Sequence, residues 1–175
     1  MNFHPIENSS DTAEICVPIL MDMYSPKSVL DLGCNTGWWL HWFIKHGVND
    51  IMGVDGVNMI NNLNIPLNKF MCMDLTKKID LGRKFDLVMC LEVAEHLEER
   101  HADRLINTAT THGDIIFWSA ATVGQGGYNH VNEQPHEYWI EKFKERGYYS
   151  KLLCDVLPPL PHDYYRKNAI QFIRL

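Results

Sequence analysis

The sequence lacks several features that would mark a membrane or secreted protein. It contains no run of 18 or more apolar residues, which a membrane-spanning helix requires. Its first residues contain neither a basic region nor the apolar core of a signal peptide. We therefore expect a soluble, cytoplasmic protein without a membrane segment.

Paired cysteines and an excess of basic residues are also missing. The five cysteines are scattered singly with no Cys-x-x-Cys pair, so we expect reduced thiols in the core. Lys and Arg number 16 against 22 Asp and Glu, which makes the net charge -6 and the pI about 5.8. The field of the whole molecule therefore repels a polyanion, and broad binding of nucleic acid is disfavoured.

Short apolar runs alternate with amphipathic stretches along most of the chain. Seven runs are expected to form strands, at 28–32, 51–54, 69–73, 85–91, 114–118, 148–156 and 169–175. Helices are expected at 9–24, 38–46, 98–111 and 135–146. This alternation predicts an α/β fold whose mostly parallel sheet is covered on both faces. Ligands of such folds bind beyond the carboxyl ends of the strands.

Glycine and acidic residues gather at those strand ends. Gly33 and Gly37 follow the first predicted strand and let the backbone turn sharply and approach a ligand closely. Asp31 and Asp55 put carboxylates at two neighbouring strand ends, where a ribose diol can bind. Asp74, after the third strand, can accept a hydrogen bond from an exocyclic amine such as that of adenine. The pattern predicts a nucleoside-containing cofactor.

A nicotinamide cofactor is the alternative within nucleotide-binding α/β folds. Its loop normally reads Gly-x-Gly-x-x-Gly, with a phosphate at the start of the following helix. Here Trp38 and Trp39 crowd that position. We therefore do not expect a dehydrogenase.

The segments Asp31-Leu32-Gly33-Cys34-Asn35-Thr36-Gly37, Gly53-Val54-Asp55-Gly56 and Met73-Asp74-Leu75 occur in this order. Together they resemble class I S-adenosylmethionine-dependent methyltransferases over nearly the whole chain. The resemblance implies a Rossmann-like α/β fold with a seven-stranded, mostly parallel sheet and a final antiparallel strand. The residues that it assigns to the cofactor S-adenosylmethionine are Asp31, Gly33, Cys34, Asn35, Gly37, Asp55, Gly56, Asp74, Leu75 and Glu92.

One position departs from the family pattern, since Asn35 replaces the usual middle glycine. Asn adopts left-handed backbone conformations more readily than other non-glycine residues, so the turn is expected to persist. The chain length predicts one methyltransferase domain over residues 1–175. We divide it into a leading helical segment (1–25), a cofactor-binding half (26–118) and a substrate-side part (119–175).

Three potential metal ligands follow the fourth predicted strand. Glu92, Glu95 and His96 are spaced i, i+3 and i+4, so a helix there would project them to one side. Such mixed oxygen and nitrogen ligands suit Mg²⁺ or Mn²⁺. A fourth ligand has to come from another strand end, and the loop after the fifth strand offers His130 and His136.

This motif resembles the metal site of small-RNA 3′-terminal 2′-O-methyltransferases and the Glu-x-x-Glu-His signature of ubiquinone-pathway O-methyltransferases. The resemblance implies a metal held by Glu92, Glu95, His96 and His130, with substrate hydroxyls as further ligands. His130 is preferred to His136 because it lies in the flexible glycine-containing loop. Without a metal, the motif would serve for hydrogen bonds or capping, and His96 or His130 would act as a general base.

Together these features predict a metal-assisted O-methyltransferase that acts on a vicinal diol of a sugar or glycan. The alternatives are 2′-O-methylation of an RNA 3′ terminus and methylation of a catechol-type small molecule. A non-catalytic methyltransferase-like binding subunit is an alternative of another class. The mixed aromatic and basic run Tyr164-Tyr165-Arg166-Lys167 can also meet a sugar or phosphate, although an ordinary polar connection is expected there.

Overall fold

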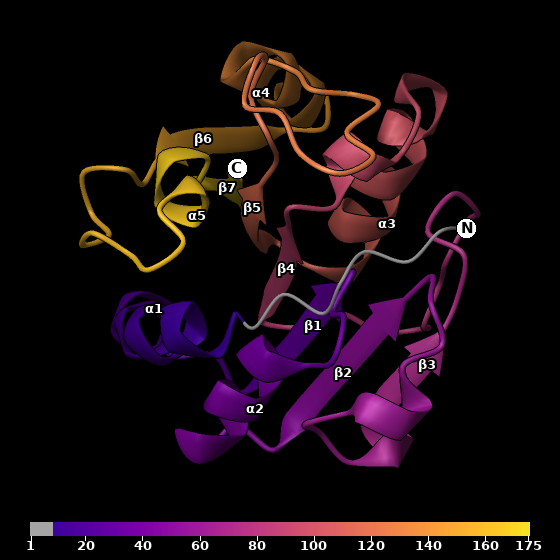
Figure 1. Ribbon diagram of the computed structural model, residues 1–175, viewed down its shortest axis with the longest axis vertical. Coiled ribbons are helices and arrows are strands. Elements are labelled where there is room, and N and C mark those ends of the chain that lie inside the picture. Colours follow the sequence, from indigo (N-terminus) through magenta and orange to yellow (C-terminus); the bar gives the residue numbers. More distant parts are fainter. Residues whose placement is uncertain (1–8) are drawn as a thin grey trace.

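The computed structural model describes residues 9–175, and residues 1–8 of the expected leading segment lie outside the described part. A seven-stranded sheet with the order β3-β2-β1-β4-β5-β7-β6 runs through the centre (Figure 1). Its strands are β1 (Ser28–Leu32), β2 (Asp50–Asp55), β3 (Phe70–Cys72), β4 (Leu87–Leu91), β5 (Ile115–Ser119), β6 (Tyr148–Leu152) and β7 (Ile170–Arg174).

Strands β1 to β5 are parallel to one another, whereas β7 is antiparallel to both of its neighbours, β5 and β6. This confirms the predicted α/β class, the seven strands and the final antiparallel strand. Because β1, β2 and β4 are adjacent and parallel, their carboxyl ends meet at one edge of the sheet. The residues that follow these three strands are therefore neighbours in space.

Helices cover both faces of the sheet, as expected. They are α1 (Ser10–Tyr24), α2 (Trp38–Lys45), α3 (Ala102–His112), α4 (His136–Lys144) and α5 (Tyr164–Lys167). Four 3-10 turns add to them, at Ile60–Asn62, Leu67–Lys69, Ala94–His96 and Glu99–His101. No helix within residues 9–175 is long and apolar enough to span a bilayer.

Alternate side chains of β4 pack into two separate cores. Met89 joins a core that includes α1 and α2, whereas Val88 and Cys90 join a second core that includes α3 and α4. All five residues of β4 are buried, as expected of a central parallel strand with both faces covered. The packed sheet thus forms a rigid platform for the residues at the strand ends.

Several predicted boundaries were wrong. The sixth strand ends at Leu152 rather than at residue 156, because the chain turns at once and Val156 N–H donates to Leu153 O at 2.9 Å. The connection before β7 contains the short helix α5, which was not predicted.

Cys72 is exposed on β3, so the expectation that every cysteine lies in the core fails there.

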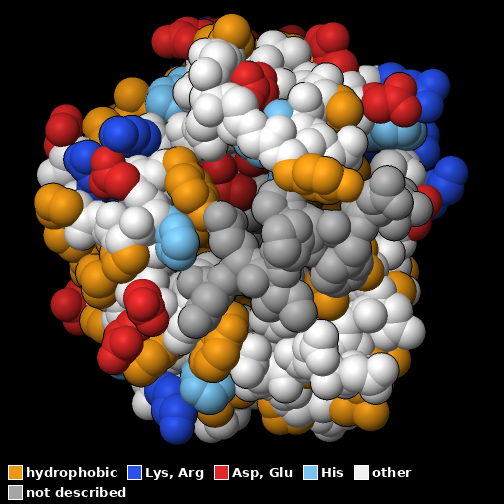
Figure 2. Space-filling model, viewed as in Figure 1, with side chains coloured by type: hydrophobic (Ala, Val, Ile, Leu, Met, Phe, Trp, Pro, Cys, Tyr) orange, Lys and Arg blue, Asp and Glu red, His pale blue; other side chains and the backbone are white. Residues whose placement is uncertain are grey.

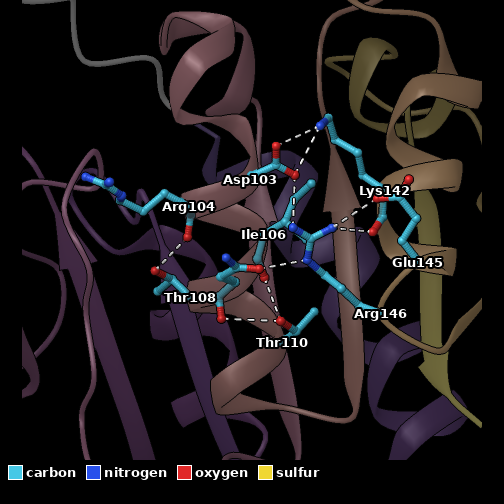
Figure 3. A network of polar contacts seen from close by, with 9 residues as sticks. Asp103, Arg104, Ile106, Thr108, Thr110, Lys142, Glu145 and Arg146 are labelled. Carbon is cyan, nitrogen blue, oxygen red and sulfur yellow. Dashed lines mark hydrogen bonds and ion pairs between the residues drawn. The ribbon is translucent and has the colours of Figure 1, made fainter.

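A polar network joins α3 to α4, the two helices of the second core (Figure 3). Asp103 of α3 accepts from Lys142 Nζ at 3.0 Å and from Arg146 Nη2 at 2.9 Å. Arg146 also donates through Nε to Asn107 Oδ1 at 2.7 Å. The network fixes α4, and so the end of the loop that precedes α4, against α3.

Candidate active site

A cavity of about 640 Å³ opens at the carboxyl ends of β1, β2 and β4. Its walls come from the glycine loop after β1, the segments after β2 and β3, residues 91–97, residues 125–130, and Tyr164 and Tyr165. Acidic side chains (red) are visible in a central recess of the face shown in Figure 2. The volume lies within the usual range of small-molecule and cofactor sites.

The glycine loop adopts the strained turn that its sequence predicts. Gly33 has φ +83°, and its N–H donates to Val54 O at 2.7 Å. A Cβ at this position would lie 2.2 Å from Val93 Cγ2, so no side chain fits. Asn35 has φ +49°, which confirms that Asn can replace the middle glycine in this left-handed turn.

Asp55 ties the glycine loop to the end of β2. Its Oδ2 accepts from Asn35 N–H and its Oδ1 from Val57 N–H, both at 2.8 Å. Burial raises the pKa of Asp55, while these two backbone donors oppose the rise. The carboxylate is thus held at the mouth of the loop with lone pairs left for a ligand.

Asp31 is the most deeply buried acid of the cofactor side, with 2% of its surface exposed. Burial, and then the charge of Asp55, raise the pKa of Asp31 to about 8. At a pKa of about 8 this carboxyl group binds a proton more readily than an ordinary aspartic acid does. A cationic ligand beside it would favour the ionised form.

Asp74 forms a compact turn after β3. Its Oδ1 accepts from the Thr76 N–H at 2.9 Å and from the Thr76 hydroxyl at 2.6 Å, and these bonds lower the pKa of Asp74. Of the residues that the sequence assigned to the cofactor, Gly37 alone does not line the cavity, since it serves as the N-cap of α2. The lining residues that sequence had assigned to the cofactor are Asp31, Gly33, Cys34, Asn35, Asp55, Gly56, Asp74, Leu75 and Glu92.

Glu92 stands at the end of β4 in a left-handed conformation, with φ +54°. Its carboxylate accepts from Asn168 Nδ2 at 3.1 Å and from Gln125 Nε2 at 3.4 Å. Burial raises the pKa of Glu92, and the donation from Asn168 opposes this most. The chain then forms only a single 3-10 turn at Ala94–His96, so the helix expected for this motif is absent.

Glu95 is completely buried, and burial together with the charge of Glu92 raises its pKa well above the usual value. Its Oε1 accepts from Ala121 N–H at 3.2 Å. Its Oε2 receives no hydrogen bond within residues 9–175. A buried carboxylate oxygen without a donor is well suited to a cation.

Glu95, His96 and His130 each offer one ligand atom, and these atoms lie within 4.8 Å of one another. The rings of His96 and His130 meet edge to face with centroids 4.9 Å apart. The glycine-containing loop reaches this place because Val131 N–H and Asn132 N–H both donate to Glu95 O, at 2.9 and 3.1 Å. Neither Glu92 nor His136 belongs to the group.

Glu133 orients His130. Its Oε1 lies 3.0 Å from His130 Nδ1, and its two carboxylate oxygens accept from the Gly126 N–H at 2.7 Å and the Gly124 N–H at 2.8 Å. The Nδ1 proton is thereby directed to Glu133, which leaves Nε2 as the atom available for a ligand or a proton.

Sequence reasoning missed Asn168, Gln125 and Glu133. No motif signals them, and Asn168 is 76 residues from the glutamate that it contacts. The structure also places Tyr164 and Tyr165 in the cavity wall, with the Tyr165 ring 5.5 Å from that of Trp39. The mixture of aromatic and basic residues in the run from Tyr164 to Lys167 was the signal in the sequence.

Solved structures of several methyltransferases share this fold. The sugar N-methyltransferase KedS8 from Streptoalloteichus sp ATCC 53650 has a TM-score of 0.75 at 16% identity, over 96% of this chain and 88% of that one. The methyltransferase domain of bacterial CtHen1-C has a TM-score of 0.70 at 17% identity, over 95% of this chain and 98% of that one. Magnesium protoporphyrin IX methyltransferase from Synechocystis PCC 6803, with bound S-adenosylmethionine, has a TM-score of 0.69 at 20% identity, over 95% of this chain and 79% of that one.

No curated protein sequence is significantly similar to the chain. A family model described as a methyltransferase domain matches residues 16–113, which is more than half of the chain. That match spans β1 to β4, the glycine loop and the Glu92–His96 motif. The chain therefore belongs to the methyltransferase domain family and is a class I S-adenosylmethionine-dependent methyltransferase.

Proposed function

We propose that the protein transfers the methyl group of S-adenosylmethionine to a hydroxyl of a vicinal diol on a sugar or glycan, assisted by Mg²⁺ or Mn²⁺. The observation that carries the proposal is the convergence of Glu95, His96 and His130 in the wall of the cavity that the cofactor segments line. The shared fold of the sugar N-methyltransferase KedS8 makes sugars the first acceptors to test.

The residues present fit a divalent cation. Glu95, His96 and His130 offer one carboxylate and two imidazoles, and with further oxygen ligands this donor set suits Mn²⁺ better than Mg²⁺, which prefers oxygen alone. Glu92 lies nearby but is engaged by Asn168 and Gln125, so it would join only if Gln125 moves aside. When bound, the cation would lower the pKa of an acceptor hydroxyl and help to orient it.

The chain itself supplies positioning and a proton acceptor. In the transfer, the acceptor oxygen forms a bond to the methyl carbon while the carbon–sulfur bond breaks and its electrons remain on sulfur. In the metal-free alternative the hydroxyl proton would pass to Nε2 of His130, because Glu133 already holds the Nδ1 side of this ring. With a cation bound, Nε2 would be a ligand instead, and the acidified hydroxyl would release its proton to water. His96 is the second candidate base, since its Nδ1 lies 3.3 Å from Asn129 O.

Metal removal tests the proposal. We expect that excess EDTA abolishes methylation without unfolding the protein, and that Glu95→Gln and His130→Ala weaken Mn²⁺ binding at least about tenfold. Electron paramagnetic resonance of free Mn²⁺ measures the binding independently of turnover. His46→Ala, at the exposed end of α2, is the matched control and should bind Mn²⁺ as the unmodified protein does. Full turnover in excess EDTA would exclude the metal and leave the general-base mechanism.

A further inference from the structure

We infer that the acceptor of this enzyme is a neutral or cationic diol, and that the cavity rejects acceptors carrying a phosphate or carboxylate group. The inference rests on the proposed function, because it names the class of acceptor for the same site. It comes from the charges of the cavity wall rather than from those of the whole molecule.

Five carboxyl groups line the cavity, those of Asp31, Asp55, Asp74, Glu92 and Glu95. Among the described residues, the wall contains no Lys and no Arg. The sequence of residues 1–8 contains neither of them either. On the face shown in Figure 2, acidic side chains lie in the central recess while Lys and Arg (blue) lie toward the edges.

Cofactor and metal do not reverse this charge. S-adenosylmethionine has one net positive charge, from its sulfonium and ammonium groups less its carboxylate, and a divalent cation adds two. Bound cofactor and cation favour the ionised form of the carboxyl groups beside them, and five carboxylates outnumber these three positive charges. An anionic acceptor would therefore enter a field of its own sign.

Two arginines near the wall are already engaged. Arg166, beside Tyr165, donates to Asp163 at 2.7 Å and to Cys154 O at 3.0 Å. Arg104 donates to Thr76 O at 3.0 Å. Phosphate recognition in proteins relies on Arg, Lys or clustered backbone N–H groups, and the described wall offers no such cation.

The rest of the wall suits a neutral polar ligand. Trp39 and Tyr165 present aromatic surface, and Gln125 brings an amide group to Glu92. A basic hollow does exist on α3, lined by Lys78, Arg100 and Arg104 among others, but none of these three residues lines the cavity. The structure therefore favours an uncharged sugar over an RNA terminus.

Matched acceptors that keep the same diol test the inference. The pairs are glucose with glucose 6-phosphate, adenosine with adenosine 5′-monophosphate, and catechol with 3,4-dihydroxybenzoate. Methylation is followed with radiolabelled S-adenosylmethionine and Mn²⁺. In every pair that reacts, we expect kcat/KM to be at least about tenfold higher for the neutral member.

A charge substitution provides the second measurement. Gln125→Lys puts a cation beside Glu92, so it should reduce the ratio of kcat/KM between the neutral and the anionic member of a pair. Val123→Lys lies on the same loop but outside the wall, and it should leave this ratio unchanged. Preference for an anionic member, or an unchanged difference in Gln125→Lys, overturns the inference while leaving diol methylation intact. If S-adenosylmethionine binds but no diol of the panel is methylated, the inference and the proposed function fail together.

Discussion

Backbone conformation at single residues shapes the cofactor side of the cavity. Gly33, Asn35 and Glu92 all have φ between +49° and +83°, a region that residues with side chains seldom adopt. Such conformations cost about 1–3 kcal/mol each for non-glycine residues and persist where surrounding contacts enforce them. At Glu92 these contacts are the N–H bond to Ser119 O and the amide of Asn168.

Gly33→Ala should abolish tight cofactor binding. Its Cβ would strike Val93 at 2.2 Å, so the loop or β4 must shift. We expect the affinity for S-adenosylmethionine, measured by titration calorimetry, to fall at least about tenfold, because small displacements of a binding loop are costly. Gly47→Ala is the control, with a similar φ of +89° but nothing within 4 Å. It should lose only about 1 kcal/mol of stability, and equal affinity in both variants would contradict the argument.

Asp31 makes stability depend on pH with a definite sign. Its pKa is raised in the folded protein to about 8 but is ordinary in the unfolded chain, so the folded state binds the extra proton between about pH 4 and pH 8. Stability should therefore fall as pH rises through this window. Asp55, Glu92 and Glu95 add to the fall, because burial raises their pKa as well. Asp31→Asn should therefore make the fall shallower and raise Tm at pH 7.5 by about 3 °C or more.

Thermal unfolding of the cofactor-free protein from pH 5 to pH 8 measures this effect. Asp22→Asn, at an exposed position on α1, is the control and should keep the slope of the parent protein. A parent protein whose Tm rises steadily across the window would show that Asp31 is ionised in the empty cavity.

At the scale of elements, two connections determine the site. The loop before α4 is held to Glu95 O by two backbone bonds, and α4 is held to α3 by Asp103, Lys142 and Arg146 (Figure 3). The position of His130 therefore depends on a helix pair that does not line the cavity. After β4 the chain forms a 3-10 turn, and the Glu92 and Glu95 carboxyl groups contact each other while Asn168 donates to Glu92 and Ala121 N–H donates to Glu95.

Asp103→Ala should weaken the contact between α3 and α4. The ion pairs are partly exposed, so we expect a loss of about 1 kcal/mol in the free energy of unfolding, and less in 1 M NaCl. Urea denaturation at low and high salt measures this. Glu141→Ala removes a pair within α4 alone and should cost less. A loss for Asp103→Ala that does not change with salt would contradict an electrostatic role.

At the scale of the whole molecule, the last strand lies inside the sheet. β7 pairs with both β5 and β6, so β6 contacts the sheet only through a segment that comes after it in the chain. Asn168, which holds Glu92, lies two residues before β7. Correct insertion of the final strand is therefore required both for the fold and for the site.

Deletion of residues 169–175 should prevent folding. It would leave β5 and β6 with unpaired backbone groups and remove Ile170 and Phe172 from the core. We expect loss of the cooperative unfolding transition in circular dichroism. Leu175→Ser, at a residue that is 94% exposed, is the control and should unfold like the parent protein. A truncated chain with a normal transition would show that β7 is dispensable.

The sequence by itself determined most of the fold. Apolar runs identified seven strands because burial of alternate or continuous side chains leaves a local pattern. Acidic residues and glycines at the strand ends indicated the cofactor loop, and the left-handed turn at Asn35 followed from its residue type. Boundaries such as Leu152 were missed because turns depend on hydrogen bonds that no apolar pattern records.

Only the tertiary structure decided which side chains meet. It brought His130 rather than His136 to Glu95 and His96, since two backbone bonds to Glu95 O anchor the loop. It removed Glu92 from that group, because Asn168 reaches it from 76 residues away. The sequence determined residue types and local conformation, which depend on near neighbours. The active-site arrangement required the packed sheet, because its contacts join segments that are distant along the chain.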